Sequence, residues 1–93
     1  MKKVTVFYLE NCPYCKKARA AFDALLAENP AYGALTIEWI EESRQSELAE
    51  SFDYYYVPSL FAEGRKLYEC FPSEDAESIR RHIQAALNAA LES

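Results

Sequence analysis

Two cysteines in the run Cys12-Pro13-Tyr14-Cys15 have the types and spacing needed for redox chemistry. Thiols at this spacing can be oxidised together to a disulfide and reduced again. The thiolate of one attacks a substrate disulfide, and the other then resolves the mixed disulfide that forms. We assign Cys12 as the nucleophile and Cys15 as the resolving thiol. The motif therefore predicts a redox-active Cys12–Cys15 pair.

Zinc sites use the same Cys-x-x-Cys spacing and are the main alternative. A zinc site built on these two thiols would need two more ligands. The cysteine and histidine candidates that remain are Cys70 and His82. The chain has no second Cys-x-x-Cys and no His-x-x-x-His. We therefore favour thiol redox chemistry and predict no metal site.

The elements around the motif predict how it is positioned. Residues 4–9 are apolar on both faces, as in a buried strand. With Cys12 near the N-cap, Pro13 takes the first helical position, where its missing N–H costs little. The free N–H groups of the first turn and the helix dipole then favour a thiolate at Cys12, and Lys16 and Lys17 add positive charge. Apolar residues at helical spacing follow: Ala18, Ala21, Phe22, Leu25 and Leu26.

Further signals divide the rest of the chain into elements. The first helix is expected to end near residues 28–30, because residues before a proline leave the helical region. A loop at 31–33, an edge strand at 35–40, a turn at 41–45 and a short helix to about Phe52, capped by Ser43 or Ser46, are expected next. Two strands, at 59–62 and 66–71, flank a Gly-containing turn. Ser73 is the expected N-cap of a last helix, whose buried face carries Ile79, Ile83, Ala86, Leu87 and Ala90.

Length and composition limit the class of protein. With 93 residues, 51% of them apolar and 14% aromatic, the chain predicts a single packed domain over residues 1–93. The net charge of −5 argues against nucleic-acid and anionic-membrane partners. No apolar run approaches the ~20 residues of a spanning helix. The apolar run after Lys3 stops at Glu10, too early for a signal peptide, so we expect a cytoplasmic protein. We also expect it to be a monomer.

The motif, together with Val57-Pro58 before the predicted hairpin, resembles the glutaredoxins of the thioredoxin-like superfamily. This resemblance covers nearly the whole chain. It implies an α/β, thioredoxin-like β-α-β-α-β-β-α fold with a four-stranded mixed sheet flanked by helices. It also implies a cis Val57–Pro58 bond beside the cysteines. Substrate contacts would then come from Pro13, Tyr14, Val57, Pro58, Ser73 and Asp75.

Residues expected to contact glutathione differ from the family pattern. A typical glutaredoxin has lysine three residues before the first cysteine, where this chain has Leu9, followed by Glu10. The family's Gly-Gly pair is replaced by the run Cys70-Phe71-Pro72. The N–H groups at residues 73–75 remain available in principle for a γ-glutamyl carboxylate. The acidic side chains of Glu10, Glu74 and Asp75 are expected to repel an anionic tripeptide.

Other candidate residues have two interpretations each. The tyrosines at 54–56 either line a partner surface or pack alternately on the core. Cys70 is either a small apolar strand residue, which we favour, or a third redox thiol near the motif. We interpret Trp39 as a core residue and His82 as structural.

The predicted activity is that of a dithiol thiol–disulfide oxidoreductase. Its partners would be disulfide-containing proteins or small thiols, with a reductase or glutathione as the electron donor. No bound cofactor is required, because the dithiol carries the electrons; glutathione is a possible co-substrate. The resemblance also implies an alternative, a glutathione-assisted [2Fe–2S] carrier in which two protomers hold the cluster through Cys12.

Overall fold

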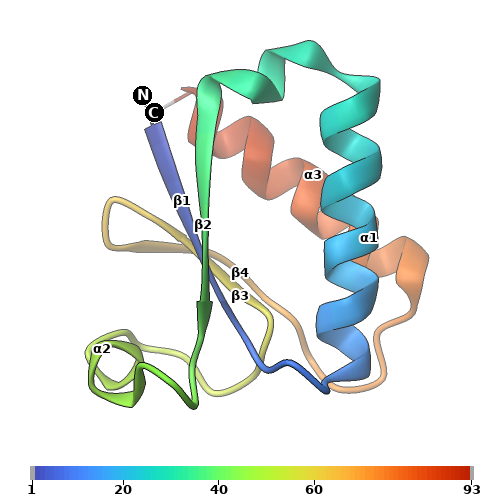
Figure 1. Ribbon diagram of the computed structural model, residues 1–93. Helices are drawn as coiled ribbons and strands as arrows, with labels where there is room; N and C mark the ends of the chain where they lie inside the picture. Colours follow the sequence, from blue (N-terminus) through green and yellow to red (C-terminus); the bar gives the residue numbers. More distant parts are fainter. Residues whose placement is uncertain (1, 93) are drawn as a thin grey trace.

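Four strands form one mixed sheet in the computed structural model, which describes residues 2–92. Their spatial order is β2-β1-β3-β4 (Figure 1). β1 pairs in parallel with β2 and antiparallel with β3, and β3 pairs antiparallel with β4. The predicted edge strand is thus confirmed as β2. The strand bounds are Lys2–Tyr8 for β1, Leu35–Glu41 for β2, Ser59–Ala62 for β3 and Arg65–Glu69 for β4.

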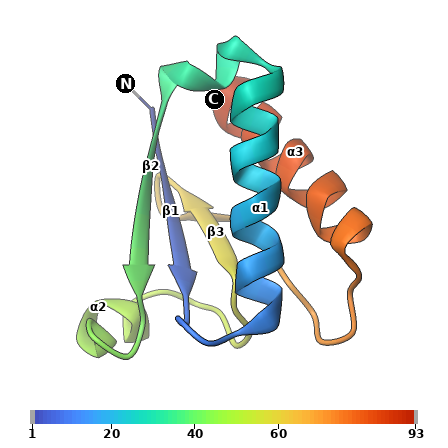
Figure 2. The ribbon, with the colours of Figure 1, turned by 45° about the vertical axis from the view of Figure 1, so that its right-hand side comes forward.

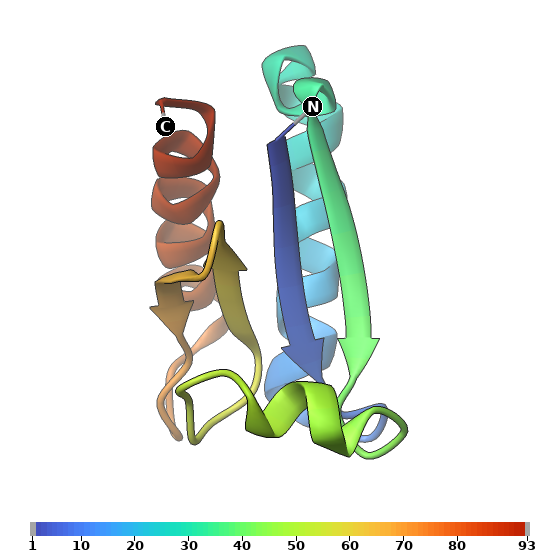
Figure 3. The same ribbon diagram turned by 90° about the vertical axis from the view of Figure 1, so that its left-hand side faces the viewer.

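The two long helices cover the same face of the sheet. α1 spans Pro13–Glu28 and α3 spans Ala76–Glu92, and the two pack against each other (Figure 2). A short helix, α2, spans Ser46–Glu50 and lies on the other face, at the end where β1 and β2 stop (Figure 3). The element order and the α/β thioredoxin-like architecture are therefore those predicted from the sequence.

Each face of the sheet has its own apolar core. On the α1/α3 face, all five apolar positions predicted for the last helix are buried against strand residues such as Val4, Val6 and Leu60. On the other face, Phe7 and Phe61 pack with Ala49 of α2 and with the half-buried ring of Tyr54. The second core therefore lies directly beneath the segment that leads to Val57 and Pro58.

Several predicted boundaries and caps were wrong. The expected loop after α1 is a 3-10 helix, η1, over Pro30–Ala34. β4 ends at Glu69, so Cys70 lies just beyond the strand. Neither Ser43 nor Ser46 is the N-cap of α2: that position is Gln45, which makes no side-chain cap, and Ser46 is the first helical residue. The Ser43 hydroxyl donates to Glu41 Oε1 at 2.6 Å instead.

The start of α3 also differs from the prediction. Ser73 lies outside the helix with a positive φ of 75°. The carboxylate of Asp75 accepts the N–H of Ser78 at 2.8 Å and takes the capping role. None of the helices within residues 2–92 is long and apolar enough to span a membrane.

Candidate active site

Cys12 occupies the N-cap of α1. Its backbone is extended, with φ −80° and ψ 122°, and Pro13 follows at the start of the helix. The carbonyl of Cys12 accepts the Lys16 N–H at 3.1 Å, so the helical hydrogen bonding begins at the cysteine itself. The side chain of Cys12 is partly exposed. The first sulfur therefore lies at the positive end of a 16-residue helix and is open to an incoming group.

Cys15 has a different environment although it is only three residues away. It lies in the first turn of α1 and is 4% exposed. Burial raises the pKa of its thiol to about 12; the backbone at Leu9 acts in the opposite direction, and the neighbouring Cys12 side chain raises it further. Both cysteines are free thiols here. At neutral pH, Cys15 is accordingly a protonated, shielded thiol held next to Cys12.

The segment before β3 faces the first sulfur. The Val57–Pro58 peptide bond is cis, as the family resemblance implied. Cys12 Sγ lies 3.9 Å from the carbonyl oxygen of Val57, and the carbonyl of Pro58 accepts the N–H of Cys70 at 3.0 Å. The carbonyl ends of the two adjacent residues thus contact Cys12 on one side and Cys70 on the other.

Tyr14 connects the start of α1 to the segment before α3. Its hydroxyl oxygen accepts the N–H of Ser73 at 2.7 Å, and Lys17 Nζ lies 5.6 Å from its ring centroid. Two of the residues expected to bind substrate are therefore engaged within the protein: the Ser73 N–H by Tyr14, and the Asp75 carboxylate by the Ser78 N–H in the first turn of α3. Pro13 is exposed beside them.

Cys70 lies next to the site but is closed to solvent. It is 1% exposed, and burial raises the pKa of its thiol. Its backbone N–H is bonded to the carbonyl of Pro58, the residue that follows Val57, whose carbonyl oxygen lies 3.9 Å from Cys12 Sγ. Within residues 2–92, no three His, Cys, Asp or Glu side chains are arranged to hold a metal ion.

Three glutamates hold the loops around the cysteines through hydrogen bonds that could not be predicted from the sequence. Glu69 Oε2 accepts the N–H groups of both Tyr55 and Tyr56 at 2.7 Å. Glu41 accepts the N–H of Glu10 at 3.1 Å, just before the motif. Glu74 accepts the N–H of Phe71 and the hydroxyl of Tyr68, both at 2.9 Å. The residues next to these glutamates in the sequence give no indication of these contacts.

The remaining aromatic candidates differ in burial. The tyrosines at 54–56 do not pack alternately on the core: Tyr54 stacks on Phe7 with ring centroids 4.9 Å apart, while Tyr55 and Tyr56 are exposed. Trp39 is half-buried and packs edge-on against Phe22 at 4.9 Å.

His82 is on the surface of α3. Its Nδ1 lies 2.8 Å from Glu74 Oε1, and its ring stacks on Tyr68. This agrees with the structural role expected from the sequence.

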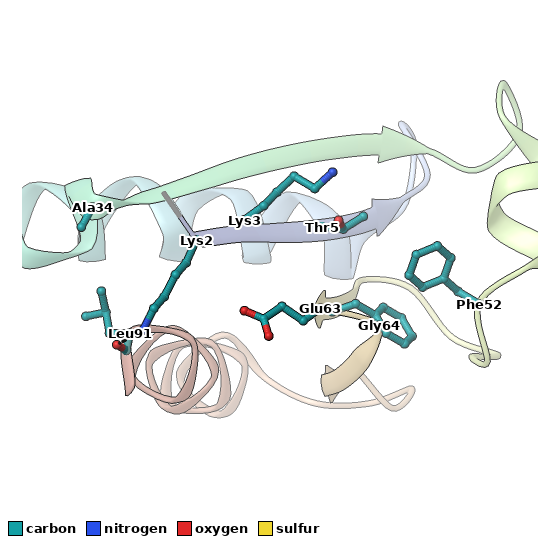
Figure 4. Close-up of a pocket in the computed structure, with 9 residues that line it drawn as sticks. Lys2, Lys3, Thr5, Ala34, Phe52, Glu63, Gly64 and Leu91 are labelled. Atoms are coloured by element: carbon teal, nitrogen blue, oxygen red, sulfur yellow. Dashed lines mark hydrogen bonds between the residues drawn. The ribbon is translucent and has the colours of Figure 1, made fainter. Parts of the chain in front are cut away.

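Two hollows in the surface differ in their relation to the thiols. A cleft of about 510 Å³ borders Cys12 and is also lined by Glu10, Glu41 and Arg44. A larger cavity of about 1030 Å³ lies between the start of β1, the turn after β3 and the end of α3, and Figure 4 shows its lining side chains. No cysteine lines this larger cavity. Size alone therefore does not mark the site; the position of the sulfurs does.

The fold and the site together define a class of protein. A mixed sheet, a cis proline and a Cys-x-x-Cys at the start of the first helix are the features of a thioredoxin-like protein with a thiol-redox function. A sequence model of the glutaredoxin family matches residues 4–67. The chain belongs to the glutaredoxin family. No curated protein sequence matches it.

Solved structures with the same fold are distant in sequence. A point mutant of thioredoxin from Halobacterium salinarum NRC-1 is 19% identical, with a TM-score of 0.59, covering 92% of this chain and 74% of that one. A malarial protein is 18% identical, with a TM-score of 0.62 and coverage of 94% and 98%. The zinc-bound form of human ERp44 is 16% identical, with a TM-score of 0.55; 89% of this chain matches 25% of that one. These similarities support the fold alone.

Proposed function

We propose that the protein is a dithiol thiol–disulfide oxidoreductase with Cys12 as the nucleophile and Cys15 as the resolving thiol. One observation carries the proposal: an accessible sulfur at the N-terminus of α1 lies 3.9 Å from the Val57 carbonyl, with a buried second thiol in the same helical turn. The family and the fold support thiol-redox chemistry in general. The contrast between the two cysteines supports the dithiol form of it.

The reaction runs in two exchanges. The Cys12 thiolate attacks one sulfur of a substrate disulfide; the substrate S–S bond breaks, and its other sulfur leaves as a thiolate that takes up a proton. Cys15 then loses its proton and attacks Cys12 Sγ, which releases the second substrate thiolate and forms the Cys12–Cys15 disulfide. The substrate gains two electrons and the protein loses two. An external thiol reductant, as yet unidentified, restores the dithiol.

The high pKa of Cys15 explains why this thiol reacts second. A thiol with a pKa of about 12 stays protonated at neutral pH and does not compete with Cys12 for the incoming disulfide. It reacts when the mixed disulfide is already in place, because only then is a disulfide sulfur held beside it. Burial of Cys15 thus separates the roles of two chemically identical side chains.

Substitution of each cysteine tests these roles. Cys12→Ser is expected to abolish disulfide reduction. Cys15→Ser is expected to accumulate a covalent mixed disulfide between Cys12 and the substrate, because the resolving thiol is missing. Both outcomes are measured by mass spectrometry without reductant and by a steady-state disulfide reduction assay. Cys70→Ser serves as the control, with full turnover expected. Reduction by the Cys12→Ser variant at the wild-type rate would refute the proposal.

A further inference from the structure

Three exposed aromatic rings form a surface beside the first sulfur. Tyr55 is 94% exposed, Phe71 61% and Tyr56 44%. The rings are continuous, since the centroids of Tyr55 and Tyr56 are 6.4 Å apart and those of Tyr56 and Phe71 are 5.8 Å apart. We refer to Tyr55, Tyr56 and Phe71 as the aromatic patch. Leu48 is the one other large apolar residue within residues 2–92 that is comparably exposed.

Two residues of the aromatic patch directly adjoin, in the sequence, residues whose backbone lies at the active site. Tyr56 directly precedes Val57, whose carbonyl contacts Cys12 Sγ. Phe71 directly follows Cys70, whose N–H is bonded to Pro58. A polypeptide whose disulfide reaches Cys12 therefore has these rings within reach of the residues next to its oxidised cysteine.

The aromatic patch is also held in place before any partner arrives. Glu69 accepts the N–H groups of Tyr55 and Tyr56, and its other oxygen is paired with Lys66 at 2.8 Å. The N–H of Phe71 is held by Glu74. Aromatic side chains on a fixed backbone offer a large contact area with little ordering cost, which is why they are frequent at binding hot spots.

The segment between β4 and α3, by contrast, has few free N–H groups that could bind a small anionic thiol. The N–H groups of Phe71, Ser73 and Ser78 are bonded to Glu74, Tyr14 and Asp75, respectively. These are three of the N–H groups near the start of α3 that could otherwise receive a carboxylate. Glutathione carries two carboxylates and no apolar side chain, so the aromatic patch gains little from it. A polypeptide with an apolar side chain gains the contact area of the rings.

We propose that the aromatic patch binds an apolar side chain next to the oxidised cysteine of a polypeptide substrate, so that protein disulfides are preferred over glutathione. This inference rests on the proposed function and names the substrate class of the same site.

The test compares two synthetic peptides of equal length, each with one cysteine capped as a mixed disulfide with 2-mercaptoethanol. The cysteine is flanked by phenylalanine in one peptide and by glycine in the other. For the wild-type protein, with dithiothreitol as the reductant, kcat/KM is expected to be roughly tenfold higher for the phenylalanine peptide, and mainly through KM. In the double variant Tyr55→Ala, Phe71→Ala the ratio is expected to fall to about one. Leu48→Ala, the matched exposed control, is expected to keep the wild-type ratio.

Each other outcome has a definite meaning. Equal rates for the two peptides in the wild-type protein, or an unchanged ratio in the double variant, overturn the inference and leave the proposed function standing. Faster reduction of oxidised glutathione than of the phenylalanine peptide also overturns it. A dimer in sedimentation that the double variant abolishes would assign the patch to a second copy of the chain instead. Failure of the wild-type protein to reduce any of these disulfides refutes the proposed function, and the inference with it.

Discussion

Cys12 and Cys15 have the same side chain but differ in exposure and in their electrostatic surroundings. Cys12 is at the N-cap, where unpaired N–H groups and the helix dipole favour negative charge. Cys15 faces the core with 4% exposure, where burial favours the neutral thiol. The motif and its place between a strand and a helix were enough to predict both positions, because a residue at the N-cap lies at the end of the helix whereas one three positions later lies within its first turn.

The hydroxyl of Tyr14 is predicted to stabilise the fold by connecting the start of α1 to the segment before α3. Tyr14→Phe removes the acceptor for the Ser73 N–H, which is 2.7 Å away, and leaves the ring in place. The free energy of unfolding is expected to fall by about 1 kcal/mol, the usual net value of one hydrogen bond. Urea denaturation measures this. Tyr55→Phe is the control, since that ring is 94% exposed and little change is expected. Equal losses in the two variants would contradict a specific role for Tyr14.

At the scale of elements, the segment between β4 and α3 departs most from its sequence prediction. Ser73 has the residue type of an N-cap but adopts a positive φ of 75°, and Asp75 caps the helix instead. A local sequence signal cannot distinguish two capping residues that are two positions apart. The contact that holds the Ser73 N–H comes from Tyr14, which is 59 residues away in sequence. Likewise, β4 ends at Glu69, and the side chain of this residue binds the backbone of Tyr55 and Tyr56.

Glu74 is predicted to make the stability of this segment depend on pH. Although its partial burial opposes the charge, hydrogen bonds from Ser78, the Phe71 N–H, Tyr68 and His82 lower the pKa of Glu74 to about 2 from an ordinary 4.5. The carboxylate therefore contributes stability that is full above about pH 4.5 and is lost as the pH falls towards 2. A shift of this size corresponds to about 3 kcal/mol.

Unfolding of the wild-type protein and of Glu74→Gln at a series of pH values measures this contribution. The wild type is expected to be the more stable near neutral pH, and the difference is expected to shrink by up to about 3 kcal/mol between about pH 5 and pH 2. Glu77→Gln, at an exposed position in the first turn of α3, is the control and should show no such convergence. A difference that stays constant with pH would contradict the assignment.

At the scale of the whole molecule, the sheet brings three segments that are distant in sequence together at one end of its strands. β1 delivers the motif, β3 follows Val57–Pro58, and β4 leads into Cys70 and Phe71. The apolar pattern predicted the strands and the buried face of α3, because the residues of each element show which side of it is buried. The family resemblance implied the topology that connects them. The pairings between segments were not predictable in the same way. The contacts of Glu69 with Tyr55 and of Tyr14 with Ser73 depend on side chains that meet only after the sheet has formed.

The central claim is that the fold presents Cys12 as the attacking sulfur at the N-terminus of α1 and keeps Cys15 buried as the resolving thiol. Iodoacetamide labelling of the reduced protein at neutral pH, followed over time by peptide mass spectrometry, tests it most directly. Cys12 is predicted to react roughly fivefold faster than N-acetylcysteine, while Cys15, with a pKa of about 12 and 4% exposure, stays unmodified over the same period. Labelling of Cys12 no faster than N-acetylcysteine, or labelling of Cys15 first, would contradict the account.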